Sequence, residues 1–179
     1  NFDAFRAIYL HEMDRFRRTL TQSVLSPVLT TSLYFIVFGS VIGGYVEKID
    51  GISYGSYIVP GLLMLTLLTQ SISNTSFGIF FPKFNGTIYE ILAAPISTLE
   101  VVLAFVGAGA TKTLIVSIII FITSLFFVDV QVKYPLLMIF LLILVAFTFA
   151  LFGFLIGLMS SDFEQMSIIP TLFVTPMVF

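Results

Sequence analysis

The sequence contains no cysteine and only one histidine, His11. The missing cysteine excludes disulfide bonds and thiolate metal sites. A single histidine also excludes imidazole clusters, and one imidazole on a charged helix does not indicate a Ser-His-Asp triad. Neither a GxxxxGK[ST] nor a GxGxxG phosphate-binding loop is present. We therefore expect no catalytic residue, no cofactor bound by this chain and no metal site.

Charged residues are also scarce. They make up 10% of the 179 residues, whereas 58% are hydrophobic, and the mean hydropathy is +1.09. Soluble domains contain about 25% charged residues. A soluble fold of this length has too little interior to bury so much apolar surface, so we expect an all-α integral membrane protein. The net charge of −2 gives no argument for nucleic-acid binding.

Apolar stretches divide the chain into candidate membrane spans, each needing about 20 residues as a helix. The predicted spans, all within one transmembrane domain, are 28–46, 57–81, 101–128, 135–159 and 166–179. Ser26 and Pro27 are predicted to begin the first span, and Pro82 to close the second. The chain stops inside the fifth stretch, so we read it as incomplete and expect at least five transmembrane helices.

Residues 1–22 carry many charges and no long apolar run, so we expect no cleavable signal peptide in this stretch. Apolar side chains recur every three or four residues, at Phe2, Phe5, Tyr9, Met13, Phe16 and Leu20. The arginines and acids are placed on the other faces. This pattern predicts an amphipathic helix at the cytoplasmic membrane interface. A helix packed on a partner subunit would show the same periodicity, and the two interpretations are compatible.

Lysine and arginine are unevenly distributed between the two sides of the predicted spans. If the N-terminus is inside, the inner segments contain Arg6, Arg15, Arg17, Arg18 and Lys83, and the outer loops contain Lys48 and Lys133. Five against two predicts a cytoplasmic N-terminus, because positive residues concentrate on that side. Four tyrosines lie at the predicted outer ends, as in an aromatic belt: Tyr45, Tyr54, Tyr57 and Tyr134.

The third predicted span contains Lys112, whose charge costs about 2.5–3.5 kcal/mol at the bilayer centre. The region 101–128 is longer than a span needs. We therefore expect its helix to begin in the cytoplasm and Lys112 to snorkel to the inner interface. The alternative is a contact in a substrate path.

The second predicted span carries polar side chains on one helical face: Thr66, Gln70, Ser73 and Asn74. Lipid offers them no hydrogen-bond partner, so this face must meet another helix or water. They either hydrogen-bond between helices, at about 0.6 kcal/mol per bond, or line a translocation path. Small residues at helical spacing predict close helix packing: Gly107, Gly109, Ala110, Gly153 and Gly157.

The predicted spans offer no internal source of energy for transport. No pair of carboxylates lies within a span, and the potassium-filter pattern TVGYG is missing. A transporter of this kind would need a partner to drive it. Two other classes stay open, a secondary transporter or channel and a non-transporting scaffold or lipid enzyme. For an enzyme, only Asp162, Glu164 and isolated polar residues are available.

The loop between the second and third spans runs from Pro82 to Ser97, ends in Leu-Ala-Ala-Pro-Ile-Ser and is followed by Glu100. Arg17-Arg18 and Leu25-Ser26-Pro27 precede the first span, and Tyr57-Ile-Val-Pro-Gly-Leu62 begins the second. In this order, the motifs resemble those of the ABC type 2 permease family. The likeness covers essentially the whole chain, although each motif is short.

The resemblance implies a six-span permease that pairs with a second copy of itself and exports cargo across the bacterial inner membrane. The cargo would be hydrophobic, lipid-linked or a polysaccharide. ATP and Mg would be bound by a separate ATP-binding subunit, not by this chain, which would contact that subunit and the membrane lipids. This sequence departs from the family pattern by stopping before the last span and the re-entrant hairpin near it.

The resemblance also assigns residues. The coupling helix, which an ATP-binding subunit grips, would comprise Phe84, Asn85, Gly86, Thr87, Ile88, Tyr89, Glu90 and Leu92 within the loop 83–97. Residues expected at the cytoplasmic interface are Arg15, Arg17, Arg18, Glu100 and Lys112. Phe84, Ile88, Ile91 and Leu92 are expected near one side of a helix. Without the family, an ordinary interfacial linker is the alternative.

Overall fold

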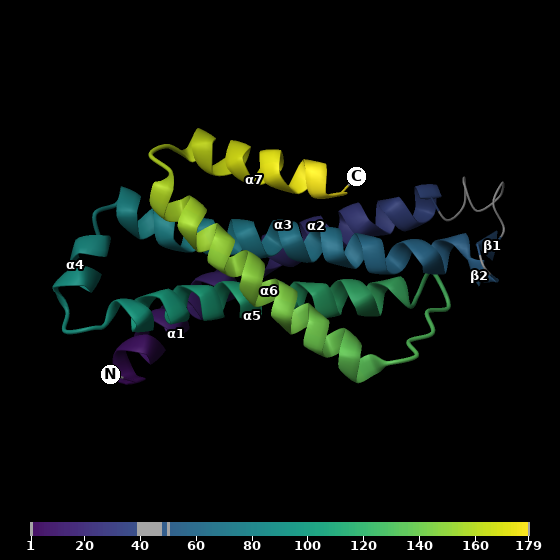
Figure 1. Cartoon of the computed structure of the whole chain (residues 1–179), viewed down its shortest axis with the longest axis horizontal. Coiled ribbons are helices and arrows are strands. Elements are labelled where there is room, and N and C mark those ends of the chain that lie inside the picture. Colours follow the sequence, from purple (N-terminus) through teal and green to yellow (C-terminus); the bar gives the residue numbers. More distant parts are fainter. Residues whose placement is uncertain (1, 39–47, 50, 179) are drawn as a thin grey trace.

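A computed structural model of the chain describes residues 2–38, 48–49 and 51–178 (Figure 1). Its helices are α1 (Phe2–Arg18), α2 (Leu20–Ile36), α3 (Tyr54–Phe84), α4 (Ile88–Ala93), α5 (Thr98–Ser124), α6 (Pro135–Met159) and α7 (Phe163–Val178). Two short strands, β1 (Lys48–Ile49) and β2 (Ile52–Ser53), pair antiparallel with Lys48 opposite Ser53. Everything else that is regular in the described part is helical, which confirms the all-α fold class.

Three of the described helices, α3, α5 and α6, are long and apolar enough to cross a membrane. As described, helices α2 and α7 have 17 and 16 residues, which is shorter than the roughly 20 residues that a spanning helix needs. The predicted span 28–46 and Tyr45 lie partly or wholly in 39–47, outside the described residues. The chain is an all-α integral membrane protein, and the total of five or more spans stays a prediction.

Helix α6 begins and ends where the fourth span was predicted, because Pro135 suits the first helical turn and Ser160 has extended backbone angles. The helix start predicted at Ser26 and Pro27 is wrong, whereas the bounds of the first span stay a prediction. Helix α2 begins at Leu20, eight residues earlier than residue 28, and Pro27 lies inside it. Hydropathy marks where a helix enters lipid, whereas the hydrogen-bonded helix continues into the polar flank.

Two other predicted ends are also wrong. Pro82 does not close α3, which continues to Phe84. Helix α5 ends at Ser124 and not at residue 128, because the backbone then forms tight turns in which the Phe127 N–H donates to the Ser124 carbonyl at 3.1 Å. Phe126 in these turns is 84% exposed, so the apolar run continues beyond the helix.

Helix α3 is the centre of the bundle and packs against α5, α6 and α7, with α6 crossing over α3 and α5 (Figure 1). Glycines make this crossing close. A Cβ at Gly157 would lie 2.6 Å from the Ser76 carbonyl oxygen, and one at Gly153 would meet the backbone of Ile72. A Cβ at Gly109 of α5 would likewise collide with the side chain of Thr75 on α3. The prediction that small residues allow close helix packing is confirmed at these positions.

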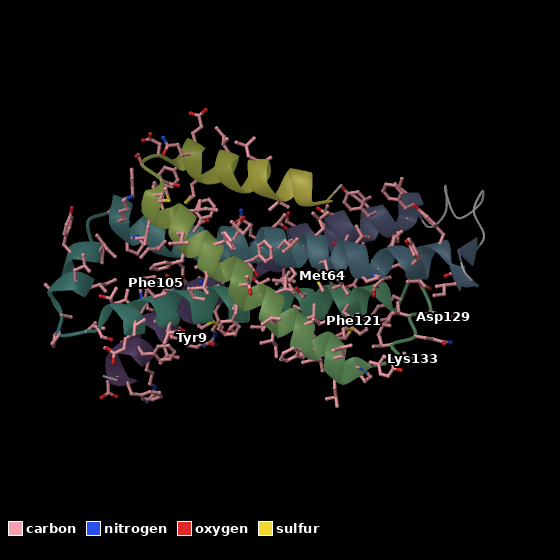
Figure 2. All side chains as sticks on the ribbon, viewed as in Figure 1. Tyr9, Met64, Phe105, Phe121, Asp129 and Lys133 are labelled. Atoms are coloured by element: carbon pink, nitrogen blue, oxygen red, sulfur yellow. The ribbon has the colours of Figure 1, made fainter. Side chains whose placement is uncertain are left out.

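The connections gather at two opposite ends of the bundle. Helix α4 lies at one end, between the last residues of α3 and the first of α5 (Figure 1). The strand pair and the α5–α6 loop, with Asp129 and Lys133, lie at the other end (Figure 2). The loops predicted to be inner and outer are therefore separated in space as the sequence predicts.

Candidate coupling end and buried charges

Helix α4 is joined to α3 by a tight turn. Gly86 has φ +80°, a left-handed conformation that favours glycine after a helix end. The Gly86 N–H donates to the Lys83 carbonyl at 3.4 Å, and the Tyr89 N–H donates to the Gly86 carbonyl at 3.1 Å. This turn lets the six-residue α4 fold back against the bundle after only three intervening residues, 85–87.

The side chains of α4 face two ways. Ile88 and Ile91 are half-buried against the core formed by α3, α5 and α6. Tyr89 and Leu92, three residues apart, are 73% and 67% exposed. Sequence reasoning placed Phe84, Ile88, Ile91 and Leu92 near one side of a helix. This is wrong for Leu92, which faces outward, and for Phe84, which is the last residue of α3. The outward pair forms a separate apolar face on a helix that is anchored from beneath.

Helix α5 begins with a capping box, in which two side chains bond each other's backbone. The Ser97 hydroxyl accepts from the Glu100 N–H at 3.3 Å, and the Glu100 carboxylate accepts from the Ser97 N–H at 2.9 Å. Pro95 keeps the preceding residue extended. The Pro-Ile-Ser and glutamate pattern is thus the start signal of α5, and Glu100 fixes that start.

Lys83 ties the end of α3 to the end of α6. Its Nζ donates to the carbonyl oxygens of Leu158 at 2.6 Å and Ser160 at 2.8 Å. A cation suits a helix C-terminus because the last carbonyls are unpaired and carry partial negative charge. Phe84 packs edge-on against Phe163 at the start of α7, with ring centroids 5.0 Å apart. Helices α3, α6 and α7 are therefore connected at this end.

Lys112 forms an ion pair inside the bundle. Its Nζ lies 2.7 Å from Glu12 Oε2, and the two side chains are 4% and 2% exposed. Arg15 holds the other carboxylate oxygen, with Nη1 3.2 Å from Glu12 Oε1. A Cβ built on Gly78 of α3 would lie 3.4 Å from Glu12 Oε2, so the carboxylate sits where α1, α3 and α5 meet.

Lys112 therefore does not snorkel to water, and that prediction is wrong. The Lys112 side chain still points in the direction that snorkelling would require. Its partner Glu12 lies beside Gly78, and Gly78 also faces Phe105, which is seven residues before Lys112 on α5. The ammonium extends toward the α4 end and finds a carboxylate before it reaches the surface. Its assignment to the cytoplasmic interface stays a prediction.

Sequence reasoning placed Glu12 on the polar side of α1, and this is also wrong. Glu12 lies between the apolar Tyr9, Met13 and Phe16 at helical spacing, which was a usable signal for a buried partner. Phe16 is 4% exposed, and the Tyr9 hydroxyl donates to Thr111 Oγ1 at 3.0 Å. The apolar stripe of α1 thus packs on α5 of the same chain. An interfacial position for α1 stays a prediction, as does the membrane side of the exposed Arg17 and Arg18.

Among the described residues, the polar face of α3 makes one interhelical hydrogen bond. Asn74 Nδ2 donates to Thr113 Oγ1 of α5 at 3.3 Å and to Gln70 Oε1 at 3.4 Å. The Thr66 hydroxyl instead donates to the Leu62 carbonyl of its own helix at 2.9 Å. The Ser73 carbonyl accepts from the Ser76 hydroxyl of the same helix. For Asn74, these contacts favour a role in helix packing over a translocation path.

No group of three or more His, Cys, Asp or Glu side chains in the described part of the chain could hold a metal ion. The acids at the α6–α7 turn, Asp162 and Glu164, are exposed. Within that part, the charged and polar side chains described above form hydrogen bonds and ion pairs that stabilise helix ends and helix–helix contacts. At the α4 end of the bundle, these contacts connect the helices, and α4 presents an exposed apolar face.

Comparison with known proteins identifies the family. Residues 3–179 match the ABC-2 type transporter family. The inner membrane transport permease YadH of Escherichia coli strain K12 is 37% identical over 176 residues, covering 98% of this chain and 69% of YadH. YadH of Shigella flexneri gives the same identity and coverage. No solved structure matches. The chain therefore belongs to the ABC-2 type transporter family and is an ABC transporter permease.

Proposed function

We propose that this permease is the membrane-spanning subunit of an ATP-driven exporter in the bacterial inner membrane, with a cytoplasmic N-terminus. It moves hydrophobic, lipid-linked or polysaccharide cargo out of the cytoplasm. The similarity to an inner membrane transport permease supports the location. Five basic residues on the predicted inner side against two on the outer side support the orientation.

The exposed face of α4 is the observation on which the proposal depends. Tyr89 and Leu92 project from the end of the bundle, while Ile88 and Ile91 fix the helix beneath them. A large aromatic and a large aliphatic side chain on a rigid support suit a protein–protein contact. The partner is a separate ATP-binding subunit, which binds the ATP and Mg and hydrolyses the nucleotide.

A push on α4 would reach the spanning helices directly. The Gly86 turn joins α4 to α3, and the Ser97–Glu100 capping box joins it to α5 within a few residues. Lys83 connects the same end to α6. In a dimer of two copies, such movements would open and close a path for cargo between the subunits, in an alternating-access cycle.

Copurification tests this function. The full transporter is purified in detergent as the unsubstituted chain, as a Tyr89→Ala/Leu92→Ala variant and as a Leu136→Ala control. Leu136 is 83% exposed at the start of α6, at the opposite end of the bundle from α4. We expect an ATPase to copurify with the unsubstituted chain and the control, and to be lost from the α4 variant. An unsubstituted chain that never retains an ATPase would contradict the proposal.

A further inference from the structure

The buried ion pair between Glu12 and Lys112 joins α1 to α5, beside the apolar packing of α2 on α5 around Phe35, Val116 and Ile120. Lys112 belongs to α5, which follows α4 directly. Glu12 belongs to α1, which leads into α2. We propose that this pair is the directional link by which movement of α4 and α5 reaches α2, because the apolar contacts between α2 and α5 allow sliding. This inference rests on the proposed function, since it needs a partner that drives α4.

The position of the pair fits such a link. Lys112 lies 14 residues after the start of α5 at Thr98, about 21 Å along the helix at 1.5 Å per residue. Both charged side chains are nearly inaccessible to solvent. In such surroundings water does not replace a lost partner, so separating Glu12 from Lys112 is far costlier than breaking a surface pair. The two helices are therefore held to move together at this point.

The second half of the link is the junction of α1 and α2. The backbone hydrogen bonds continue through Thr19, whose N–H donates to the Phe16 carbonyl at 3.1 Å. The Thr19 carbonyl then accepts from the Ser23 N–H at 2.9 Å. Because a single residue, Thr19, separates the two helices and is hydrogen-bonded to both, a displacement of α1 is passed to α2 and is not absorbed by a loop.

Other contacts between α1 and α5 are weaker or less directional. The Tyr9–Thr111 hydrogen bond joins two neutral groups at 3.0 Å, and Phe16 makes apolar contacts that allow sliding. Charge-assisted hydrogen bonds are about twice as strong as neutral ones and fix geometry more strictly. Glu12 and Lys112 are therefore positioning residues for α2, with no contact to cargo or nucleotide required.

Arg15 supplies a matched control. It contacts the same carboxylate as Lys112, at 3.2 Å, but it belongs to α1 itself. Its loss removes one charge and one ion pair and leaves the connection between α1 and α5 in place. The double variant Glu12→Gln/Lys112→Met removes that connection and leaves neither Glu12 nor Lys112 as an unpaired buried charge.

The absence of cysteine allows single-site labelling. A Leu33→Cys substitution on α2 and an Ile122→Cys substitution on α5 place an environment-sensitive fluorophore at side chains that are 60% and 50% exposed. Each labelled chain, purified with its ATP-binding partner in lipid nanodiscs, is compared without nucleotide and with ATP and vanadate. The same measurement is made in the double variant and in Arg15→Gln.

We expect ATP to shift the fluorescence at both positions in the unsubstituted chain and in Arg15→Gln. In the double variant, the shift at position 122 remains and the shift at position 33 is lost. An unchanged shift at position 33 in the double variant would overturn the inference, and so would its loss in Arg15→Gln. No response at either position in the unsubstituted chain would instead count against the proposed function.

Discussion

Lys83 at the end of α3 donates a hydrogen bond of 2.6 Å to the main-chain carbonyl of Leu158, one residue before α6 ends. The contact joins the C-terminal ends of two spanning helices that run in the same direction, at the same end as α4 (Figure 1). The sequence shows Lys83 only as one positive charge among five on the predicted inner side. The structure gives it the additional role of a helix cap supplied by a neighbouring helix.

Replacing this cap should weaken the bundle. Lys83→Met leaves the Leu158 and Ser160 carbonyls without the cation, so we expect the free energy of unfolding to fall by about 1 kcal/mol. Lys83→Arg keeps a cation within reach and should lose less. Thermal unfolding of both variants in detergent measures the difference, and equal midpoints for Met and Arg would contradict the capping role.

The α5 capping box predicts a second stability effect. Ser97→Ala removes the hydroxyl that accepts from the Glu100 N–H, at an expected cost of about 1 kcal/mol. Ser97→Asp supplies another good N-cap acceptor and should stay close to the unsubstituted chain. Both variants are compared by thermal unfolding. An Ala variant as stable as the Asp variant would show that the box contributes nothing.

The close crossing of α6 over α3 predicts a steric effect. A Gly157→Ala substitution places its methyl group against the Ser76 carbonyl and the Ile79 side chain, so we expect a loss of about 1–3 kcal/mol. Gly61→Ala on α3 is the matched control, because no atom lies within 4 Å of its added Cβ. It should be neutral or slightly stabilising, since alanine favours helix. A loss at Gly61 as large as at Gly157 would contradict this packing.

The hydrogen bond between Asn74 and Thr113 can be measured by a double-mutant cycle. The variants are Asn74→Ala, Thr113→Val and their combination, and we expect a coupling energy of about 0.6 kcal/mol. The bonds that each residue makes within its own helix cancel in the cycle. A coupling near zero, together with changed transport in Asn74→Ala, would favour a path role over packing.

Hydropathy was sufficient for α6, whose bounds agree with the apolar run because proline and serine mark its two ends. It failed at α2 and α5, since backbone hydrogen bonding does not stop where apolar residues stop. The glycines on α6 predicted that another helix packs closely against α6, but they did not predict that this helix is α3. For these features the sequence specifies the helix, and the three-dimensional neighbour comes only from the structure.

The site was predictable to a similar extent. The residues of the α4 loop could be named in advance, but which of them face outward could not, because Ile88 and Leu92 are equally apolar. Glu12 and Lys112 are 100 residues apart, and each alone suggests a residue that seeks water. Only their proximity makes both stable in the interior.

If α4 receives the force of a separate ATPase, the two must be in contact, and site-specific photo-crosslinking detects that contact. A photo-reactive amino acid is placed at Tyr89 and, as a control at the opposite end of the bundle, at Phe126, where both side chains are largely exposed. In membranes of producing cells, we predict a crosslink to the ATP-binding subunit from position 89 and none from position 126. Crosslinks to that subunit from position 126, or none from position 89 while the complex is assembled, would contradict the claim.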